Sequence, residues 1–157
     1  MSVLDDELDL KILKILQQDG RVSFTDIAKE LDVAVSTVRN RYNNFISQDI
    51  LKIYGRINPE KVGLNAYARI SICVRPKNKI TEVIEKLKEL REISFMASVS
   101  GEFDLEVNVM CKDTNHLTQM MHDYINNLEG VDHTVINFYL KVHKFTHLDL
   151  DLAKHHQ

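Results

Sequence analysis

Hydrophobic positions over the first fifty residues recur at the spacing of amphipathic helices. The first apolar stripe consists of Leu8, Ile12, Leu13, Ile15 and Leu16. A second, short stripe follows Ser23, which with Asp26 forms a helix-capping pattern. A third begins at Val35 and reaches Ile46. Because helices this short are marginal alone, the pattern predicts a three-helix unit over residues 1–50.

From Leu51 the hydrophobic period changes to two, the spacing of strands. A short strand is expected from Leu51 until Pro59 interrupts it, followed by a strand over 66–75. Helical spacing returns at Val83–Leu90, a hairpin turns at Gly101, a second helix follows, and a last strand runs from Thr134 to Val142. In that hairpin Phe95 is expected on the core side and Met96 on the other face.

This order of elements, β-α-β-β-α-β, is that of the ferredoxin-like fold. We therefore predict an α+β protein, with an N-terminal three-helix helix-turn-helix domain followed by a ferredoxin-like αβ-sandwich domain. The predicted boundaries are 1–50 for the helical domain, 51–63 for a strand linker, 64–145 for the sandwich and 146–157 for a C-terminal tail.

Both sandwich helices are expected on one face of the sheet, because right-handed crossovers place them on the same side. The opposite face is then expected to carry a mixture of apolar and polar groups, among them Tyr67, Cys73, Met96, Met110, Val135 and Tyr139. Such a surface is too apolar to be left in water, which predicts that it is covered by assembly.

The second and third helices and the tight turn between them form a helix-turn-helix pattern. Ala28 is small where the helices cross, Val33 fills the turn, and Val38 is expected to be buried. Asn and Arg read base edges in the major groove, and Ser and Thr bond phosphates. The candidate DNA-binding residues are Ser36, Thr37, Arg39, Asn40, Arg41, Asn43 and Asn44. On the residues alone, a solvated polar face remains the alternative.

Charge partitions unevenly between these helices. The whole chain has a formal net charge of −3, which by itself indicates no nucleic-acid partner. Residues 1–32 carry a net −4, whereas residues 33–56 carry +3. Because so few basic groups could meet phosphate in one subunit, DNA binding is expected to need a dimer on a roughly palindromic site.

Several segments of the chain match, in the same order, the sequence motifs of one known protein family. They are Asp6–Leu13 (D-x-x-D-x-x-I-L), Asp19–Ser23 (D-G-R-x-S), Arg41, Ile50-Leu51, Ile57–Pro59 with Val62-Gly63, Ser100–Asp104 (G-x-x-D), and Leu128–Val131 with Thr134. Together they resemble the Lrp/AsnC family of bacterial and archaeal regulators. The sequence departs from the family pattern at two places. Asp32, Val33 and Ala34 precede the third helix, where the family usually has a Ser, and Ile136 stands in the last strand, where the family commonly has a Thr.

The resemblance implies a DNA-binding regulator that forms dimers and often octamers. Cys73 and Cys111, which form no CxxC pair, are expected to be reduced thiols of a cytoplasmic protein. It also implies a small-molecule effector, usually an amino acid, bound between sandwich domains. The family's pocket draws on the G-x-x-D turn, so Gly101 and Asp104 carry over, with Asp104 accepting an amino group. Ser98, Ser100 and Thr134 are neighbours by strand geometry, for which ordinary hairpin chemistry is the alternative.

No catalytic, cofactor or metal site is expected. No nucleophile motif and no Gly-rich phosphate loop is present. Cys73 and Cys111 lack metal-ligand spacing, and His133 is interpreted as a surface residue. No apolar run is long enough to cross a membrane. The alternative function is a ligand-binding or assembly module with weak or lost DNA binding, favoured by the acidic first helices and by Ala34.

Overall fold

The computed structural model describes residues 6–153, which divide into two units. Within these residues, the first unit is formed by 6–56 together with 144–153, and the second by 57–143. The chain therefore leaves the first unit, builds the second, and returns. Each unit has its own hydrophobic core.

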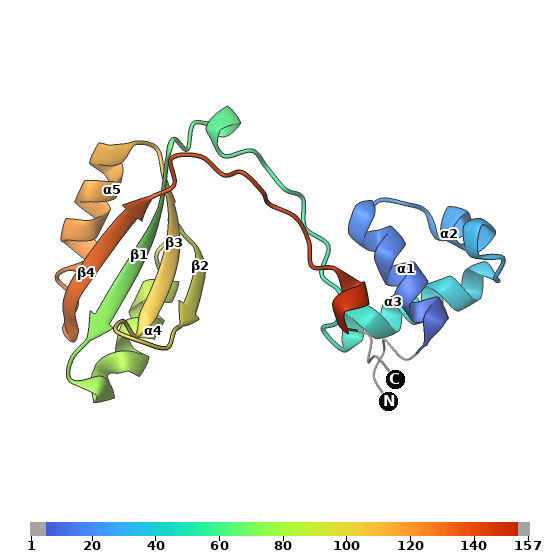
Figure 1. The fold of residues 1–157 in the computed structure, drawn as a ribbon, viewed down its shortest axis with the longest axis horizontal. Helices are drawn as coiled ribbons and strands as arrows, with labels where there is room; N and C mark the ends of the chain where they lie inside the picture. Colours follow the sequence, from blue (N-terminus) through green and yellow to red (C-terminus); the bar gives the residue numbers. More distant parts are fainter. Residues whose placement is uncertain (1–5, 154–157) are drawn as a thin grey trace. The chain divides into compact units, whose positions relative to one another are not determined.

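The first unit contains three helices, α1 (Glu7–Gln18), α2 (Phe24–Leu31) and α3 (Val35–Ser47), drawn in blue to cyan in Figure 1. Ser23 caps α2 as predicted: its hydroxyl accepts from the Asp26 N–H at 3.0 Å and donates to the Asp26 carboxylate at 2.6 Å. Asp6 caps α1 by accepting from the Leu8 N–H at 2.9 Å. Local capping thus fixes where two helices begin.

The core of this unit lies where the three helices meet. Its fully buried members are Ile12, Ile27, Val38 and Phe45. Ala28 is buried as well, and Val33 packs against the same cluster, so the predicted packing of the turn is confirmed. Asp32 adopts a left-handed conformation (φ 53°), which ends α2 and turns the chain sharply into α3. The predicted helix-turn-helix is present.

The C-terminal part of the described chain packs on α1. Gln17 Nε2 donates to the carbonyl of Leu148 at 3.0 Å, and Lys14 forms an ion pair with Asp151 at 2.5 Å. Leu150, at the start of a helical turn that ends at Ala153, packs against the helical core. The segment expected to be a tail over 146–157 is therefore part of the helical unit as far as residue 153; the last residues lie outside those described.

The second unit contains one antiparallel sheet and two helices. In chain order the elements are β1 (Ala66–Val74), α4 (Ile80–Lys88), β2 (Ile93–Ser98), β3 (Leu105–Cys111), α5 (Thr114–Met120) and β4 (Val131–Phe138). A π-helical turn, Met121–Ile125, extends α5. The strand order β2-β3-β1-β4 places the two crossover strands β1 and β3 in the centre. This is the ferredoxin-like arrangement, and the predicted α+β fold is confirmed.

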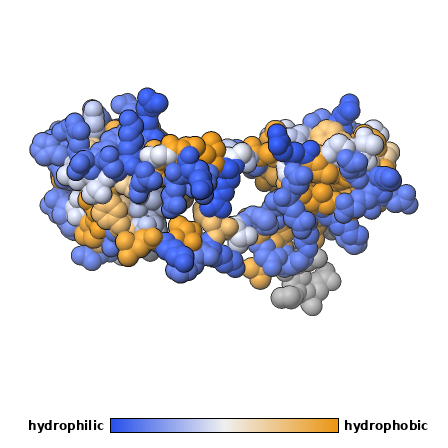
Figure 2. Space-filling model, turned by 90° about the horizontal axis from the view of Figure 1, so that it is seen from above, coloured by the Kyte–Doolittle hydropathy of each residue, from blue (hydrophilic) through white to orange (hydrophobic). Residues whose placement is uncertain are grey.

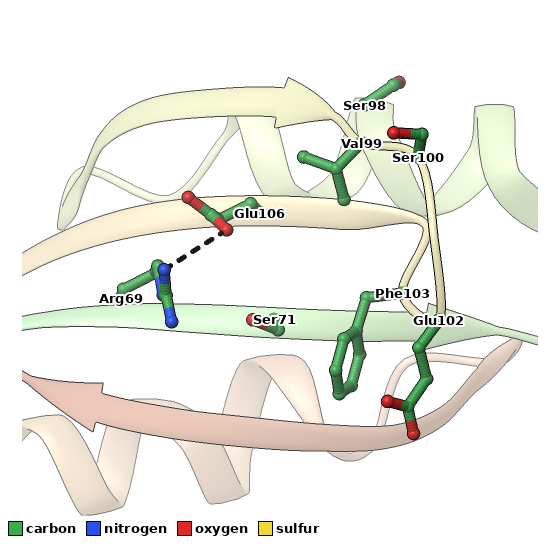
Figure 3. A pocket seen from close by; sticks show the side chains of 8 residues that line it. All are labelled: Arg69, Ser71, Ser98, Val99, Ser100, Glu102, Phe103 and Glu106. Atoms are coloured by element: carbon green, nitrogen blue, oxygen red, sulfur yellow. Dashed lines mark ion pairs between the residues drawn. The ribbon is translucent and has the colours of Figure 1, made fainter.

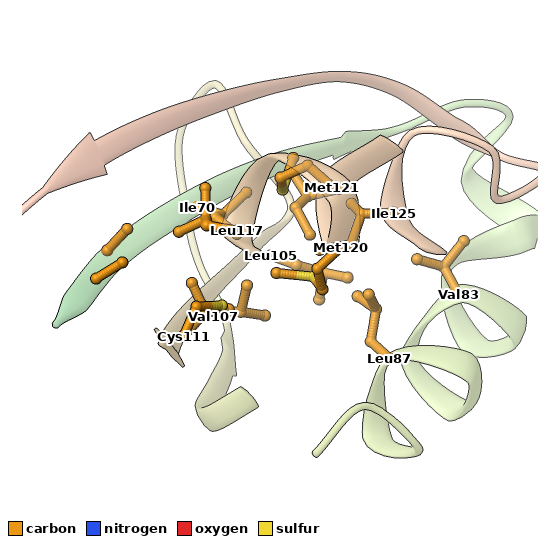
Figure 4. Packing of buried hydrophobic residues seen from close by; sticks show 14 of the residues in the cluster. Ile70, Val83, Leu87, Leu105, Val107, Cys111, Leu117, Met120, Met121 and Ile125 are labelled. Carbon is orange, nitrogen blue, oxygen red and sulfur yellow. The ribbon is translucent and has the colours of Figure 1, made fainter. Parts of the chain in front are cut away.

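One face of the sheet packs against α4 and α5 and forms the core. Figure 4 shows strand residues such as Ile70 and Val107 and helix residues such as Leu87 and Leu117 packed in one cluster. All four are at most 1% exposed. The alternating strand residues Tyr67, Arg69, Ser71 and Cys73 point to the opposite face, which we call the open face.

The prediction of which β2 side chains face the core is wrong. Met96 pairs with Val107 of β3 and packs against the core, whereas Phe95 is 52% exposed. The pairing of β2 with β3 shifts between Ile93 and Phe95. An extra residue in one strand reverses the facing of every later side chain, and alternation in the sequence alone does not reveal it.

Two strand boundaries also differ from expectation. Residues 51–58, predicted to open with a short strand, have no regular secondary structure, and β4 ends at Phe138, before Leu140 and Val142. An alternating segment becomes a strand only where a neighbour supplies ladder hydrogen bonds. None of the helices in the described part of the chain is long and apolar enough to span a membrane.

Candidate DNA-binding and ligand-binding sites

The outer side of α3 is polar and exposed. Ser36, Arg39, Asn40, Asn43 and Asn44 are exposed, and Thr37 is half-buried. The buried residues Val38 and Phe45 hold the opposite side of α3 against the core. This arrangement gives a row of donors and acceptors on a rigid helix, the geometry that major-groove readout requires.

The first turn of α3 lacks a capping side chain. Ala34 is the N-cap residue and makes no side-chain hydrogen bond, as its departure from the family pattern predicts. Backbone N–H groups at an uncapped helix start are suited to a phosphate oxygen.

Arg41 is bound within the helical unit. Its guanidinium lies 2.7 Å from the Asp6 carboxylate and 2.9 Å from that of Asp9. The hydrogen bond from Arg41 lowers the pKa of Asp6, whereas burial raises the pKa of Asp9. Asp9 is only 5% exposed, and its Oδ1 has no hydrogen-bond partner among the described residues. Arg41 thus pairs with two carboxylates, that of the cap residue Asp6 and that of Asp9 in α1, a structural role that its position among the DNA-binding candidates does not predict.

A cavity of about 620 Å³ opens on the open face of the sheet (Figure 3). Arg69 and Ser71 of β1 and Glu106 of β3 form its floor, and the loop after β2 forms its wall. Its lining is Arg69, Ser71, Ser98, Val99, Ser100, Glu102, Phe103 and Glu106. The Arg69 Nη1 and the Glu106 Oε2 are 3.8 Å apart, a loose pair of opposite charges. The Arg69 Nε is buried and lacks a hydrogen-bond partner within residues 6–153.

Only some of the predicted effector residues meet at this cavity. Ser98 and Ser100 line it, and Gly101, with φ 113°, makes the turn beside them. Thr134 pairs with the core-facing Ile72, and its hydroxyl donates to Asn126 at 3.2 Å. It therefore faces the helices, away from the cavity.

Asp104 is also directed elsewhere. Its carboxylate accepts from the Val74 N–H at 2.8 Å and from Arg75 at 3.1 Å, and forms an ion pair with Lys77. Its side chain is 12% exposed. Lys77, then the Val74 N–H, lowers the pKa of Asp104 to about 2. Asp104 fastens the hairpin turn to the end of β1 and is not among the residues that line the cavity.

Replacing Asp104 by Asn is expected to destabilise the second unit by about 1–2 kcal/mol near pH 7, a range reduced because Lys77 is well exposed. A lowered pKa stabilises the fold fully above the unfolded value of 3.8, and this contribution is lost as the pH falls towards about 2. Urea unfolding of the wild type and of Asp104→Asn from pH 7 to pH 2 should therefore show a difference in the free energy of unfolding that disappears at acidic pH. Glu102→Gln, which changes an exposed residue of the same turn, is the control. A difference in the free energy of unfolding that does not depend on pH contradicts a stabilising role of the Asp104 carboxylate.

Arg69 and Glu106 are the cavity residues that the sequence analysis missed. The alternation of β1 does place Arg69 and Ser71 on the open face. The antiparallel register, in which Ser71 pairs with Glu106, brings the two charged groups together across β1 and β3. That register depends on contacts distant in sequence.

A helix-turn-helix with a polar outer face, followed by a sandwich with a charged cavity, defines a DNA-binding protein with a small-molecule domain. Family models agree: residues 6–45 match the AsnC-type helix-turn-helix domain, and residues 65–148 match the Lrp/AsnC ligand binding domain. The chain belongs to the Lrp/AsnC family of transcriptional regulators, a family of regulators and not of enzymes.

Archaeal relatives match over nearly the whole chain. An HTH-type transcriptional regulator of Pyrococcus furiosus is 37% identical over 141 residues, covering 89% of this chain and 95% of the relative. The HTH-type transcriptional regulator FL11 of the same organism is 35% identical over 146 residues, covering 92% and 95%.

Solved structures share the fold. Escherichia coli AsnC matches with a TM-score of 0.86 at 20% identity, covering 91% of this chain and 97% of its own. A transcriptional regulator from Neisseria meningitidis, solved as a complex with L-Met, matches with a TM-score of 0.87 at 24% identity, covering 95% and 99%. The predicted two-domain fold and family are confirmed.

Proposed function

We propose that this regulator binds double-stranded DNA sequence-specifically through α3 and that an amino acid bound in the sandwich domain changes its assembly and DNA affinity. The observation that carries the DNA part is the exposed row of polar side chains on α3 above a buried core. The proposed contacts are Ser36, Thr37, Arg39, Asn40, Asn43 and Asn44. Arg41 is left out because its charge is already paired.

The open face is proposed as the dimer surface. Exposed apolar side chains on it include Phe95, Val135 and Tyr139, at 52%, 43% and 40% exposure. The Tyr139 ring packs against that of Tyr67 with centroids 4.4 Å apart and the ring planes tilted by 34°, which adds an aromatic pair to the face. Figure 2 shows hydrophobic residues among hydrophilic ones on the surface of this unit. Covering such a patch favours a homodimer, from which higher assemblies up to an octamer can form.

A dimer presents two copies of α3, so the proposed site is roughly palindromic with half-sites about 10 bp apart. DNase footprinting on the DNA upstream of the chain's own gene tests this geometry. Two protected half-sites on one face of the duplex support it; protection of a single half-site contradicts it. Absence of protection at low salt instead favours the alternative of an assembly module without DNA binding.

The cavity on the open face is proposed as the effector site. An amino acid carries a carboxylate and an ammonium group, which match the guanidinium of Arg69 and the carboxylate of Glu106. The L-Met complex of the Neisseria meningitidis neighbour supports an amino acid as the class of ligand. A DNA-binding regulator with such an effector is expected to work in the cytoplasm.

Calorimetric titration with the twenty amino acids tests the effector site. We expect at least one to bind, and Arg69→Met and Glu106→Gln each to weaken it by about tenfold or more, since each removes a charge-assisted hydrogen bond of roughly 1.5–3 kcal/mol. Asp104→Asn should leave the affinity largely unchanged because its carboxylate is engaged elsewhere. No heat from any amino acid, or equal affinity in Arg69→Met, contradicts the assignment.

A further inference from the structure

Three possible metal ligands meet at one end of the open face. Cys73 lies on β1, and Asp132 and His133 lie on β4. A thiol sulfur, a carboxylate oxygen and an imidazole nitrogen from these residues all lie within 4.8 Å of one another. None of the three is among the residues that line the cavity, and none belongs to α3.

A bulge in the sheet produces this cluster. Cys73 pairs with His133, but the next residue of β1, Val74, pairs with Val131, so Asp132 is an extra residue in β4. In a regular strand, neighbouring side chains point to opposite faces. Here the bulge brings the Asp132 carboxylate to the same ligand group as its neighbour His133, with 3.0 Å between Nδ1 and Oδ2.

The three residues combine a fixed ligand with two adjustable ones. Cys73 is 2% exposed and sits in the central strand of the sheet. The side chains of His133 and Asp132 are 47% and 52% exposed and can rotate. Tetrahedral zinc, with bonds of about 2.0–2.3 Å, holds its ligand atoms roughly 3.3–3.8 Å apart. Small rotations of the two exposed side chains therefore complete the geometry.

We propose that Cys73, His133 and Asp132 bind a zinc ion, leaving a fourth position for water. A thiolate, an imidazole and a carboxylate together match the borderline character of Zn²⁺, whereas Mg²⁺ and Ca²⁺ take oxygen ligands. The Cys73 thiol releases its proton to solvent when the metal binds. Phe103, which lines the cavity, packs its ring 5.4 Å from that of His133, so the ion adjoins the ligand cavity. This departs from the expectation, drawn from spacing alone, that the chain holds no metal.

The test uses the full-length protein, Zn²⁺ in a competition titration with a chromogenic chelator, and Co²⁺ as a spectroscopic probe. We expect one Zn²⁺ per chain and, with Co²⁺, a sulfur-to-metal charge-transfer band. Loss of a direct ligand should cost more than the ~10–100-fold typical of outer-shell changes, so Cys73→Ser and His133→Ala should each weaken zinc binding by at least about 100-fold. Cys73→Ser should also abolish the cobalt band.

Cys111→Ser is the matched control. Cys111 is the other buried cysteine, but it lies in the core on the helix side of the sheet, where burial raises its pKa to about 11. It should leave affinity and spectrum unchanged. His133→Ala changes a half-exposed side chain, so it tests the site even where Cys73→Ser impairs folding. Binding below one equivalent, no charge-transfer band, or a band that survives Cys73→Ser overturns the proposal.

Discussion

Replacing Arg39 and Asn40 together by Ala is expected to abolish specific DNA binding while leaving the fold intact. A good side-chain contact to a base edge contributes about 1–3 kcal/mol, so each change should weaken binding roughly 5- to 150-fold and the pair by about 30-fold or more. Both side chains are exposed and make no core contact. Fluorescence anisotropy with the protected upstream DNA measures the loss, and thermal unfolding checks the fold.

Lys11→Ala is the control for this experiment. Lys11 is a basic residue of α1 whose side chain is 55% exposed and paired with Glu7 one turn away. It removes the same charge from the same unit but lies outside α3, so DNA affinity should change little. If the double variant binds as well as the wild type, α3 is not the recognition helix.

Replacing Arg41 by Met is expected to lower the stability of the helical unit strongly without removing a direct DNA contact, the opposite of the Arg39 and Asn40 double replacement. The change leaves Asp9 buried without its cation, which costs about 2–3 kcal/mol, less than in a fully buried pair because Arg41 is 37% exposed. Urea unfolding of the helical unit measures the loss. Arg39→Met, an exposed arginine on the same helix, should change stability by less than ~0.5 kcal/mol.

The Arg41→Met defect should also depend on pH in a defined direction. Without Arg41, the pKa of Asp9 rises further above 3.8, because burial already raises it and the opposing cation is gone. The folded state then binds a proton more readily than the unfolded state, so lowering the pH towards 4 should reduce the defect. Adding Asp9→Asn should restore part of the stability near pH 7. An Arg41→Met protein that is fully stable yet unable to bind DNA contradicts the structural role.

The fold could be predicted from sequence where the determinants are local. The cap at Ser23, the apolar stripes and the turn at Val33 involve residues a few positions apart, and they place the helices correctly. The facing of β2 could not be predicted, because a single extra residue before Phe95 reverses the alternation without changing the composition.

The candidate sites divide in the same way. The polar face of α3 follows from helical spacing alone. Recognition that Arg41 is bound to Asp6 and Asp9 requires the packing of α1 on α3, a contact between residues more than thirty positions apart. The Arg69–Glu106 pair and the Cys73–His133 pair likewise depend on which strands are neighbours in the sheet. Sequence spacing carries no information on these contacts, so the spacing that predicts Ser98 and Ser100 does not reveal Arg69 and Glu106, which line the same cavity.

We propose above all that DNA binding by this chain responds to an amino acid. The most direct test is a titration of the wild-type protein onto its own upstream DNA, in the presence and absence of each amino acid at saturating concentration. We expect specific binding and, for at least one amino acid, a change in affinity of about 5-fold or more, the usual size of an allosteric coupling. No specific binding at low salt, or an affinity that no amino acid changes, contradicts it.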